Sequence, residues 1–402
     1  MPKIRLVTSG TYPDGMASTY RIQCYAKALQ IEGSEIEVVS PISLRKYAGR
    51  KVLLKGKHQG VPYTVILNLG KPSNKWIDYF YAEIKCYILL MHTLITAKKF
   101  DILWLYGMGF IPRMVLLPLL HLLGKKVVLE LNEYPYATEG NAYTRIPIVH
   151  NLLQKGTMSY VFPQFDGIVA ISESLKVVAE QYGKKCRPIL KIPILLDTEM
   201  HLIEKEGEKP LEELYLFHAG TLSEQKDGIL SYIKGYIEAA SKLIHHGKIL
   251  KLVLTNQSSY VWSVIEQLLK DANLFENLII TGYLNRQELI NWMSHSSVLV
   301  INKPDSFQNQ YNFPTKLGDY LLSGRPVICG SKHMELNKYL IHKKNCIQVE
   351  PNSPEAIAES IIELILTPEL AHKIGANGRK SALANFDYQV HSERLKEFFS
   401  MV

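Results

Sequence analysis

The sequence is poor in the features that mark secreted, membrane-spanning and metal-dependent proteins. Its five cysteines are scattered and odd in number, and no pair has metal-ligand spacing, which favours reduced thiols in a cytosolic protein. Residues 1–7 are typical of a β-strand rather than of a signal peptide. The apolar runs 86–97 and 114–123 are too short to span a bilayer. There is no internal repeat, low-complexity segment or Asp-x-Asp metal motif.

The size and composition favour a globular protein of two domains. With 402 residues, the chain is too long for one ordinary hydrophobic core. The hydrophobic content of 47% and the charged content of 21% are typical of a soluble protein. Strands alternate with helices in both halves, which predicts two parallel sheets. Residues 4–8, 9–15 and 16–31 open the first sheet as strand, glycine-containing loop and helix.

Positive charge is concentrated in the first half. Residues 1–197 hold 25 Lys and Arg against 14 Asp and Glu, a balance of +11, whereas residues 198–402 hold 21 against 24, a balance of −3. Residues 44–58 contain six cations and no acid, a pattern of either a solvated surface or a surface for anionic lipid. Nucleic-acid binding is disfavoured because no set of aromatic residues accompanies these cations.

Residues 312–328 are the stretch around which the sequence is organised. Pro314 and Thr315 predict a helix start, Gly324 predicts its end, and a strand follows from Pro326. The N-terminus of such a helix suits a phosphate. Asp319 lies one turn further on, where a carboxylate can bind a sugar diol. The alternative is an ordinary helix and strand of an α/β domain.

This stretch resembles the donor-site signature of retaining glycosyltransferases of family 4. The resemblance implies the GT-B fold, with two Rossmann-like domains facing a central cleft. Members usually carry two glutamates eight positions apart, and here Tyr311 and Asp319 occupy those positions. The resemblance divides the chain into an acceptor domain (1–197), a linker (198–213) and a donor domain (214–385), with a last helix (386–402) that returns to the first domain.

The resemblance also assigns residues to the nucleotide sugar. Gly220 and Lys226 match a phosphate-binding pattern in which Thr221 replaces an arginine, so that Lys316 or Arg325 would supply the missing charge. Gly282 and Tyr283 occupy the position that clasps the nucleobase. The expected donor-binding residues are Gly15, Gly220, Thr221, Lys226, Gly282, Tyr283, Asn312, Phe313, Pro314, Thr315, Lys316 and Asp319.

On the acceptor side, Gly15 and Met16 stand where the family has a pair of glycines. Asn132 and Glu133 stand where many members have histidine and aspartate, after a predicted strand. Asn132 can bind a sugar hydroxyl but cannot act as a base. Glu133 could take a proton, orient a hydroxyl or simply cap a turn. Met16, Asn132 and Glu133 are therefore the expected acceptor-binding residues.

The resemblance implies a retaining glycosyltransferase that uses a nucleotide-diphosphate sugar, with Lys226, Lys316 and Glu133 as catalytic residues. It implies no metal and no cofactor, an acceptor that is a sugar or a polyprenyl-linked sugar, and a role in bacterial surface polysaccharide or glycolipid synthesis. The protein would be cytoplasmic, with an anionic membrane surface as a partner and no nucleic acid. The alternatives are a GT-B nucleotide-sugar epimerase and a non-catalytic sugar-nucleotide-binding or scaffold protein.

Overall fold

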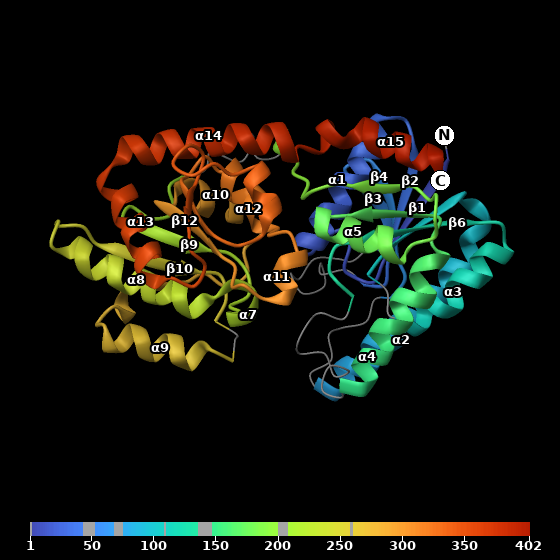
Figure 1. The fold of residues 1–402 in the computed structure, drawn as a ribbon, viewed down its shortest axis with the longest axis horizontal. Helices are drawn as coiled ribbons and strands as arrows, with labels where there is room; N and C mark the ends of the chain where they lie inside the picture. The colour runs from blue at the N-terminus through green and yellow to red at the C-terminus, as the bar shows by residue number, and fades with distance from the viewer. Residues whose placement is uncertain are drawn as a thin grey trace. The chain divides into compact units, whose positions relative to one another are not determined.

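The computed structural model describes residues 2–42, 53–67, 75–107, 110–135, 147–199, 208–257 and 260–402. The chain forms two compact units (Figure 1). Unit 1 comprises Met1–Leu195 and Tyr388–Val402, and unit 2 comprises Leu196–Asp387. Each unit is built around its own sheet with helices packed on it, so the predicted α/β fold with two mostly parallel sheets is confirmed.

The sheet of unit 1 has the strand order β3-β4-β2-β1-β5-β6-β7-β8. Every pairing is parallel except that of β3 with β4. The central strands are mostly apolar and are buried along almost their whole length, as expected for strands covered on both faces. The strands are β1 (Lys3–Thr8), β2 (Glu35–Ser40), β3 (Lys55–His58), β4 (Val61–Val65), β5 (Ile102–Tyr106), β6 (Lys126–Leu131), β7 (Gly167–Ala170) and β8 (Ile189–Lys191).

The helices of unit 1 follow the predicted pattern, with one difference. They are α1 (Ala17–Ile31), α2 (Lys75–Thr96), α3 (Phe110–Leu122), α4 (Pro147–Gly156), α5 (Glu173–Tyr182) and α15 (Ser392–Met401). The Ser172 hydroxyl caps α5 by accepting a hydrogen bond from the Leu175 N–H. From the sequence, residues 141–162 read as one helix, but α4 is followed by a short π-helix (Thr157–Val161) and a 3₁₀ helix (Phe162–Gln164), and residues 141–146 lie outside the described residues.

The sheet of unit 2 has the order β11-β10-β9-β12-β13-β14, and all of its pairings are parallel. Its strands are β9 (Leu214–His218), β10 (Leu250–Leu254), β11 (Leu278–Ile280), β12 (Val298–Asn302), β13 (Val327–Gly330) and β14 (Ile347–Val349). Its helices are α7 (Glu224–Asp227), α8 (Ile229–Ile244), α9 (Trp262–Asp271), α10 (Arg286–His295), α11 (Phe307–Tyr311), α12 (Lys316–Leu322), α13 (Pro354–Leu366) and α14 (Pro368–Phe386).

Each sheet has a point at which the strand order reverses. In unit 1, β2 and β5 lie on opposite sides of β1, and in unit 2, β10 and β12 lie on opposite sides of β9. The helices that follow the two central strands therefore lie on opposite faces and leave a crevice at the carboxyl ends of the strands. The loops after β1 and β5 define this place in unit 1, and the loops after β9 and β12 define it in unit 2.

The end of the chain belongs to unit 1. Helix α15 packs against α1, and Lys396 pairs with Glu32 at 3.1 Å. The contacts place the unit boundaries after Leu195 and after Asp387, close to the expected positions 197 and 385. No helix in the described part of the chain is long and apolar enough to cross a membrane. Of the basic run 44–58, residues 44–52 lie outside the described residues, and Lys55 and Lys57 belong to the edge strand β3.

Candidate functional site

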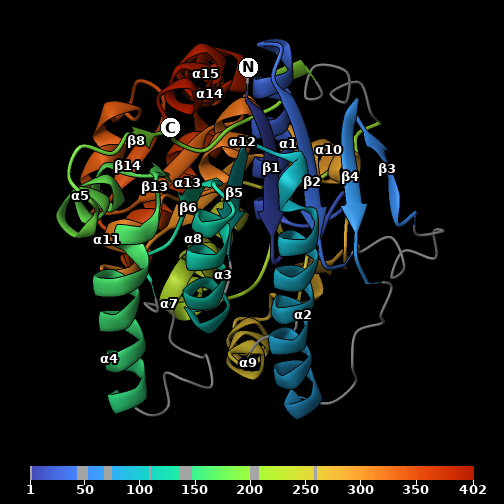
Figure 2. The same cartoon turned by 90° about the vertical axis from the view of Figure 1, so that its right-hand side faces the viewer.

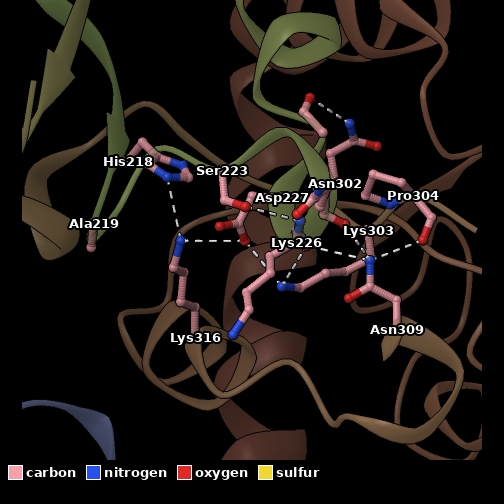
Figure 3. A network of polar contacts seen from close by, with 12 residues as sticks. His218, Ala219, Ser223, Lys226, Asp227, Asn302, Lys303, Pro304, Asn309 and Lys316 are labelled. Carbon is pink, nitrogen blue, oxygen red and sulfur yellow. Dashed lines mark hydrogen bonds and ion pairs between the residues drawn. The ribbon is translucent and has the colours of Figure 1, made fainter. Parts of the chain in front are cut away.

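The candidate site lies in unit 2, at the carboxyl ends of β9 and β12. His218 is the last residue of β9, and Asn302 is the last residue of β12, with Lys303 directly after it. Phe217 and Leu299 are register partners, so the two strands deliver these polar residues to the same edge of the sheet. Lys316, the first residue of α12, completes the group (Figure 3). The site therefore occupies the reversal point of this sheet.

Asp227, at the end of α7, lies between two lysine ammonium groups. Its Oδ1 is 3.0 Å from Lys303 Nζ and 3.5 Å from Lys316 Nζ. Lys303 Nζ also donates to the Lys226 carbonyl at 2.9 Å. The Asp227 residue is only 8% exposed. Two partly buried cations share one carboxylate here, which leaves one positive charge without a matching acid in this group.

His218 is the neutral member of the group. Its Nε2 is 3.3 Å from Lys316 Nζ, and its ring also hydrogen-bonds the Thr221 backbone. Burial and the charge of Lys316 lower the pKa of His218 to about 3. The imidazole is therefore neutral at pH 7, and Nε2 accepts a hydrogen bond from the lysine. This contact orients Lys316 without adding a third cation.

Burial also shifts the titration of the charged pair. It lowers the pKa of Lys316 to about 8, against the opposing effect of Asp227. Burial alone would raise the pKa of Asp227, but Lys316 and Lys303 outweigh it and hold that pKa well below its usual range. The adjoining cavity, of about 40 Å³, is lined by these side chains and by Pro314 and Thr315. It has room for a group of a few atoms, and the charge around it suits a phosphate.

The geometry of α7 depends on a side-chain cap at its start and on a glycine at its end. The Ser223 hydroxyl accepts a hydrogen bond from the Lys226 N–H at the start of the helix. Gly228 ends the helix with φ +49°, and an added Cβ would lie 2.4 Å from Asn302 Nδ2. The same Asn302 amide donates to the Gly228 carbonyl at 2.9 Å. The position after Asp227 therefore requires glycine, and β12 holds the end of α7 in place.

Only some of the expected phosphate-binding residues lie in the charged group around Asp227. Figure 3 shows the Lys303 and Lys316 side chains reaching the Asp227 carboxylate, while the Lys226 side chain extends away from it. Of the two candidates to replace the missing arginine, Lys316 lies in the group. Arg325 does not, because its Nε donates to the Ser294 carbonyl at 2.5 Å. Gly220 and Thr221 lie in the loop after β9, where the Gly220 N–H donates to Thr255 Oγ1 at 2.8 Å.

The residues before α12 have different environments. Pro314 and Thr315 line the cavity, as a phosphate-binding helix start would require. Phe313 instead points into the core, where its ring packs edge-on against Tyr339 and Phe386. Its side chain therefore anchors the loop to α14, and its expected contact with a donor stays a prediction. Asn312 caps the end of α11.

Asp319 has a partner that the sequence did not suggest. Both of its oxygens accept hydrogen bonds from Arg286, the first residue of α10, at 3.0 and 2.5 Å. The ion pair ties α12 to α10 next to the predicted nucleobase position. There, Gly282 has φ +76° with no side chain close to it, and Tyr283 is 72% exposed. The predicted ribose contact of Asp319 stays a prediction, and it would have to share the carboxylate with Arg286.

The expected acceptor residues lie in unit 1, around the carboxyl ends of β1, β5 and β6. Asn132 Nδ2 donates to the Tyr106 hydroxyl at 3.2 Å. The charge of Glu133, which is exposed, contributes to a raised pKa of Tyr106, although burial is the main cause. A Cβ on Gly15 would lie 2.0 Å from Thr19 Oγ1, so the loop before α1 is closely packed. Met16 directly precedes α1 and is 63% exposed.

Sequence reasoning missed His218, Asp227 and Lys303. The sequence gave a signal for two of them. His218 is a polar residue at the end of an apolar strand, and Lys303 is a polar residue directly after another. That signal has meaning only when β9 and β12 are known to be neighbours, and they are separated by β10 and β11 in the chain. Asp227 lies directly after Lys226 in the chain, and the resemblance gave it no role.

Comparisons with known proteins agree with this architecture. Residues 200–381 match the family described as Glycosyl transferases group 1. HepE of Anabaena, solved in complex with UDP-glucose, is 14% identical with a TM-score of 0.69, over 99% of this chain and 100% of that chain. Sucrose-phosphate synthase of Thermosynechococcus elongatus is 14% identical with a TM-score of 0.71, over 99% and 98%. A glycosyltransferase of Rickettsia africae is 14% identical with a TM-score of 0.67, over 100% of both chains.

A search of curated proteins gives no match. The likeness to solved structures spans both units, so it concerns the fold of the whole chain, with its two Rossmann-like units. The family match concerns unit 2 alone. The candidate site lies inside the matched segment. The chain therefore has the GT-B fold, and its residues 200–381 match the family described as Glycosyl transferases group 1.

Proposed function

We propose that this protein is a retaining glycosyltransferase that moves a sugar from a nucleotide-diphosphate sugar to a sugar or lipid-linked acceptor. One observation carries the proposal. Lys303 and Lys316 converge beside a small cavity at the reversal point of the unit 2 sheet, within the matched glycosyltransferase domain. A diphosphate is the part of such a donor that needs two cations. The UDP-glucose bound to HepE is a donor of this class.

In the proposed reaction, the bond between the sugar carbon and the diphosphate oxygen breaks while the acceptor hydroxyl attacks from the same face. The hydroxyl proton passes to the departing phosphate oxygen. Negative charge grows on that phosphate in the transition state, and Lys303 and Lys316 are placed to stabilise it. This scheme belongs to family 4 and needs neither a protein nucleophile nor a metal. His218 keeps Lys316 oriented, and Asp319 would bind the ribose.

The acceptor would bind to unit 1, near Asn132 and Glu133. Asn132 already has its amide in a hydrogen bond with Tyr106, so its side-chain oxygen is directed by that contact. Glu133 would orient the attacking hydroxyl, whose proton passes to the departing phosphate oxygen. We also propose a role in bacterial surface polysaccharide or glycolipid synthesis, at the inner face of the membrane, since the +11 balance of residues 1–197 suits an anionic surface.

The first test is the release of nucleoside diphosphate from a panel of nucleotide sugars chosen by thermal shift. Release that depends on an added acceptor would support transfer. Interconversion of the nucleotide sugar without an acceptor would instead indicate an epimerase. Binding of a nucleotide sugar with neither product would indicate a non-catalytic protein, and no thermal shift with any donor would contradict the assignment of the lysine site.

A further inference from the structure

Unit 1 exposes a large apolar surface on α2, α3 and α4. Among the described residues, 28 large hydrophobic side chains are exposed, and 12 of them belong to these helices and the turns directly after them. We call these twelve residues the helical face. They are Ile84, Tyr87, Met91 and Ile95 on α2, Met114, Val115, Leu119, Leu122 and Leu123 on and after α3, and Ile148, Leu152 and Tyr160 on and after α4.

The spacing of these residues shows that they form stripes. On α2 they recur at intervals of three or four residues, and the same interval relates Val115, Leu119 and Leu122 on α3. The opposite sides of the helices are buried against the sheet, as Leu89 and Leu90 show for α2 and Leu116 and Leu117 show for α3. Helices α2 and α3 are therefore apolar both toward the core and toward their surface.

The three stripes belong to neighbouring elements. Helix α3 contacts α2 on one side and the turn after α4 on the other. Figure 2 shows the three helices side by side in the order α4, α3, α2. The carboxyl ends of α2 and α3 carry the most exposed members of their stripes, Ile95 at 74% and Leu122 at 83%. Contiguous apolar surface of this kind marks an interaction site.

The charge of the same elements restricts the kind of partner. Among the side chains described over 84–99, 112–122, 148 and 151–164, none is acidic. Cations are present at Lys85, Lys98, Lys99, Arg113 and Lys155. A second copy of this chain would bring cations against cations, with no acid among the described side chains of these helices between them. An anionic lipid surface complements both the positive charge and the apolar side chains.

We infer that the helical face is a membrane-docking surface, which inserts apolar side chains at the level of the lipid headgroups. This inference rests on the proposed function for its purpose, because a protein that uses a lipid-linked acceptor must reach the membrane. It adds insertion of apolar side chains to the attraction between cations and an anionic surface, because a cluster of cations alone binds only by charge. Apolar insertion predicts binding that weakens at high salt without disappearing, because the Debye length shortens while the hydrophobic contribution remains.

The test is sedimentation of the full chain with two kinds of vesicle. One is made of phosphatidylcholine alone, and the other contains about one third phosphatidylglycerol, which is anionic. The test variant combines Met91→Gln, Ile95→Gln and Leu122→Gln. The control combines Ile244→Gln, Ile249→Gln and Met334→Gln, which are in unit 2 and have similar exposures of 56%, 58% and 84%. We expect the test variant to lower the partition coefficient on anionic vesicles by about tenfold or more, and the control to leave it within about twofold.

Three outcomes would overturn the inference. The test variant and the wild type could bind anionic vesicles equally, the wild type could fail to bind them, or the wild type could form a dimer that the test variant abolishes while neither binds vesicles. Circular dichroism and the melting temperature of the test variant would show that it is folded. Because vesicle binding requires no donor and no acceptor, its failure is separable from failure of the proposed glycosyl transfer, which acceptor-dependent release of nucleoside diphosphate measures.

Discussion

Lys316 Nζ lies 3.5 Å from Asp227 Oδ1, although the two residues come from different helices on opposite sides of the site. The protein thus carries its own counter-ion in a pocket suited to phosphate. A diphosphate that binds there must attract the two lysines more strongly than Asp227 does, or approach them from the other side. The carboxylate favours the charged form of Lys316 while no anionic ligand is bound, and it limits how strongly the two lysines attract other anions.

The lysine pair should dominate affinity for the diphosphate. Each charged hydrogen bond contributes about 1.5–3 kcal/mol, so Lys303→Met and Lys316→Met should each weaken UDP binding roughly ten- to a hundredfold. Lys332→Met is the matched control, because Lys332 is 52% exposed and pairs with Glu350. Calorimetric titration would measure all three, and an unchanged affinity in both test variants would remove the lysines from the site.

Binding of the diphosphate should weaken as the pH rises through the titration of Lys316. Burial lowers the pKa of Lys316 to about 8, so the ammonium loses its charge between about pH 7 and pH 9 in the protein without ligand. UDP affinity should therefore fall over this range. In Lys316→Arg, the guanidinium stays charged, and the fall should disappear even if the affinity at pH 7 is lower. Titrations at a series of pH values would reveal an equal fall in both proteins if another group were responsible.

The buried His218 should make the protein sensitive to acid. Its pKa is lowered from 6.5 to about 3, so between these values the unfolded chain binds a proton that the folded protein does not. Stability therefore falls as the pH decreases from about 6.5, by at most about 1.4 kcal/mol per pH unit for one group. His218→Gln should reduce this slope, whereas the exposed His245→Gln should not. Urea unfolding between pH 7 and pH 4 is the measurement, and identical slopes would contradict the prediction.

Asp319 should contribute both to structure and to donor binding. Its bidentate pair with Arg286 predicts a coupling free energy of about 1–2 kcal/mol in a double-mutant cycle of unfolding. If the carboxylate also binds ribose, Asp319→Ala should weaken binding of the nucleoside diphosphate much more than Arg286→Ala does. Equal losses from both substitutions would mean that Asp319 acts only by holding α12 against α10.

The sequence by itself determined the two sheets, the position of most elements and the place of the helix start at 314–316. These features depend on local pattern: apolar runs of strand length, helical periodicity, and the residues that begin and end helices. Ser172 as the cap of α5 and Gly324 after α12 follow from such local rules, and both hold in the structure. The resemblance added the assignment of the second half as the donor domain, since the motifs that carry it are also local in the sequence.

The tertiary structure decided which charges meet. His218, Asp227, Lys303 and Lys316 come from four segments, and their contacts depend on the order β10-β9-β12 in the sheet, which no single segment encodes. The same order separates Arg325 from the site and gives Asp319 the partner Arg286. It also turns Phe313 into the core. Side-chain partners across a sheet are long-range contacts, and their selection rests on the packing of the whole unit rather than on the spacing of residues along the chain.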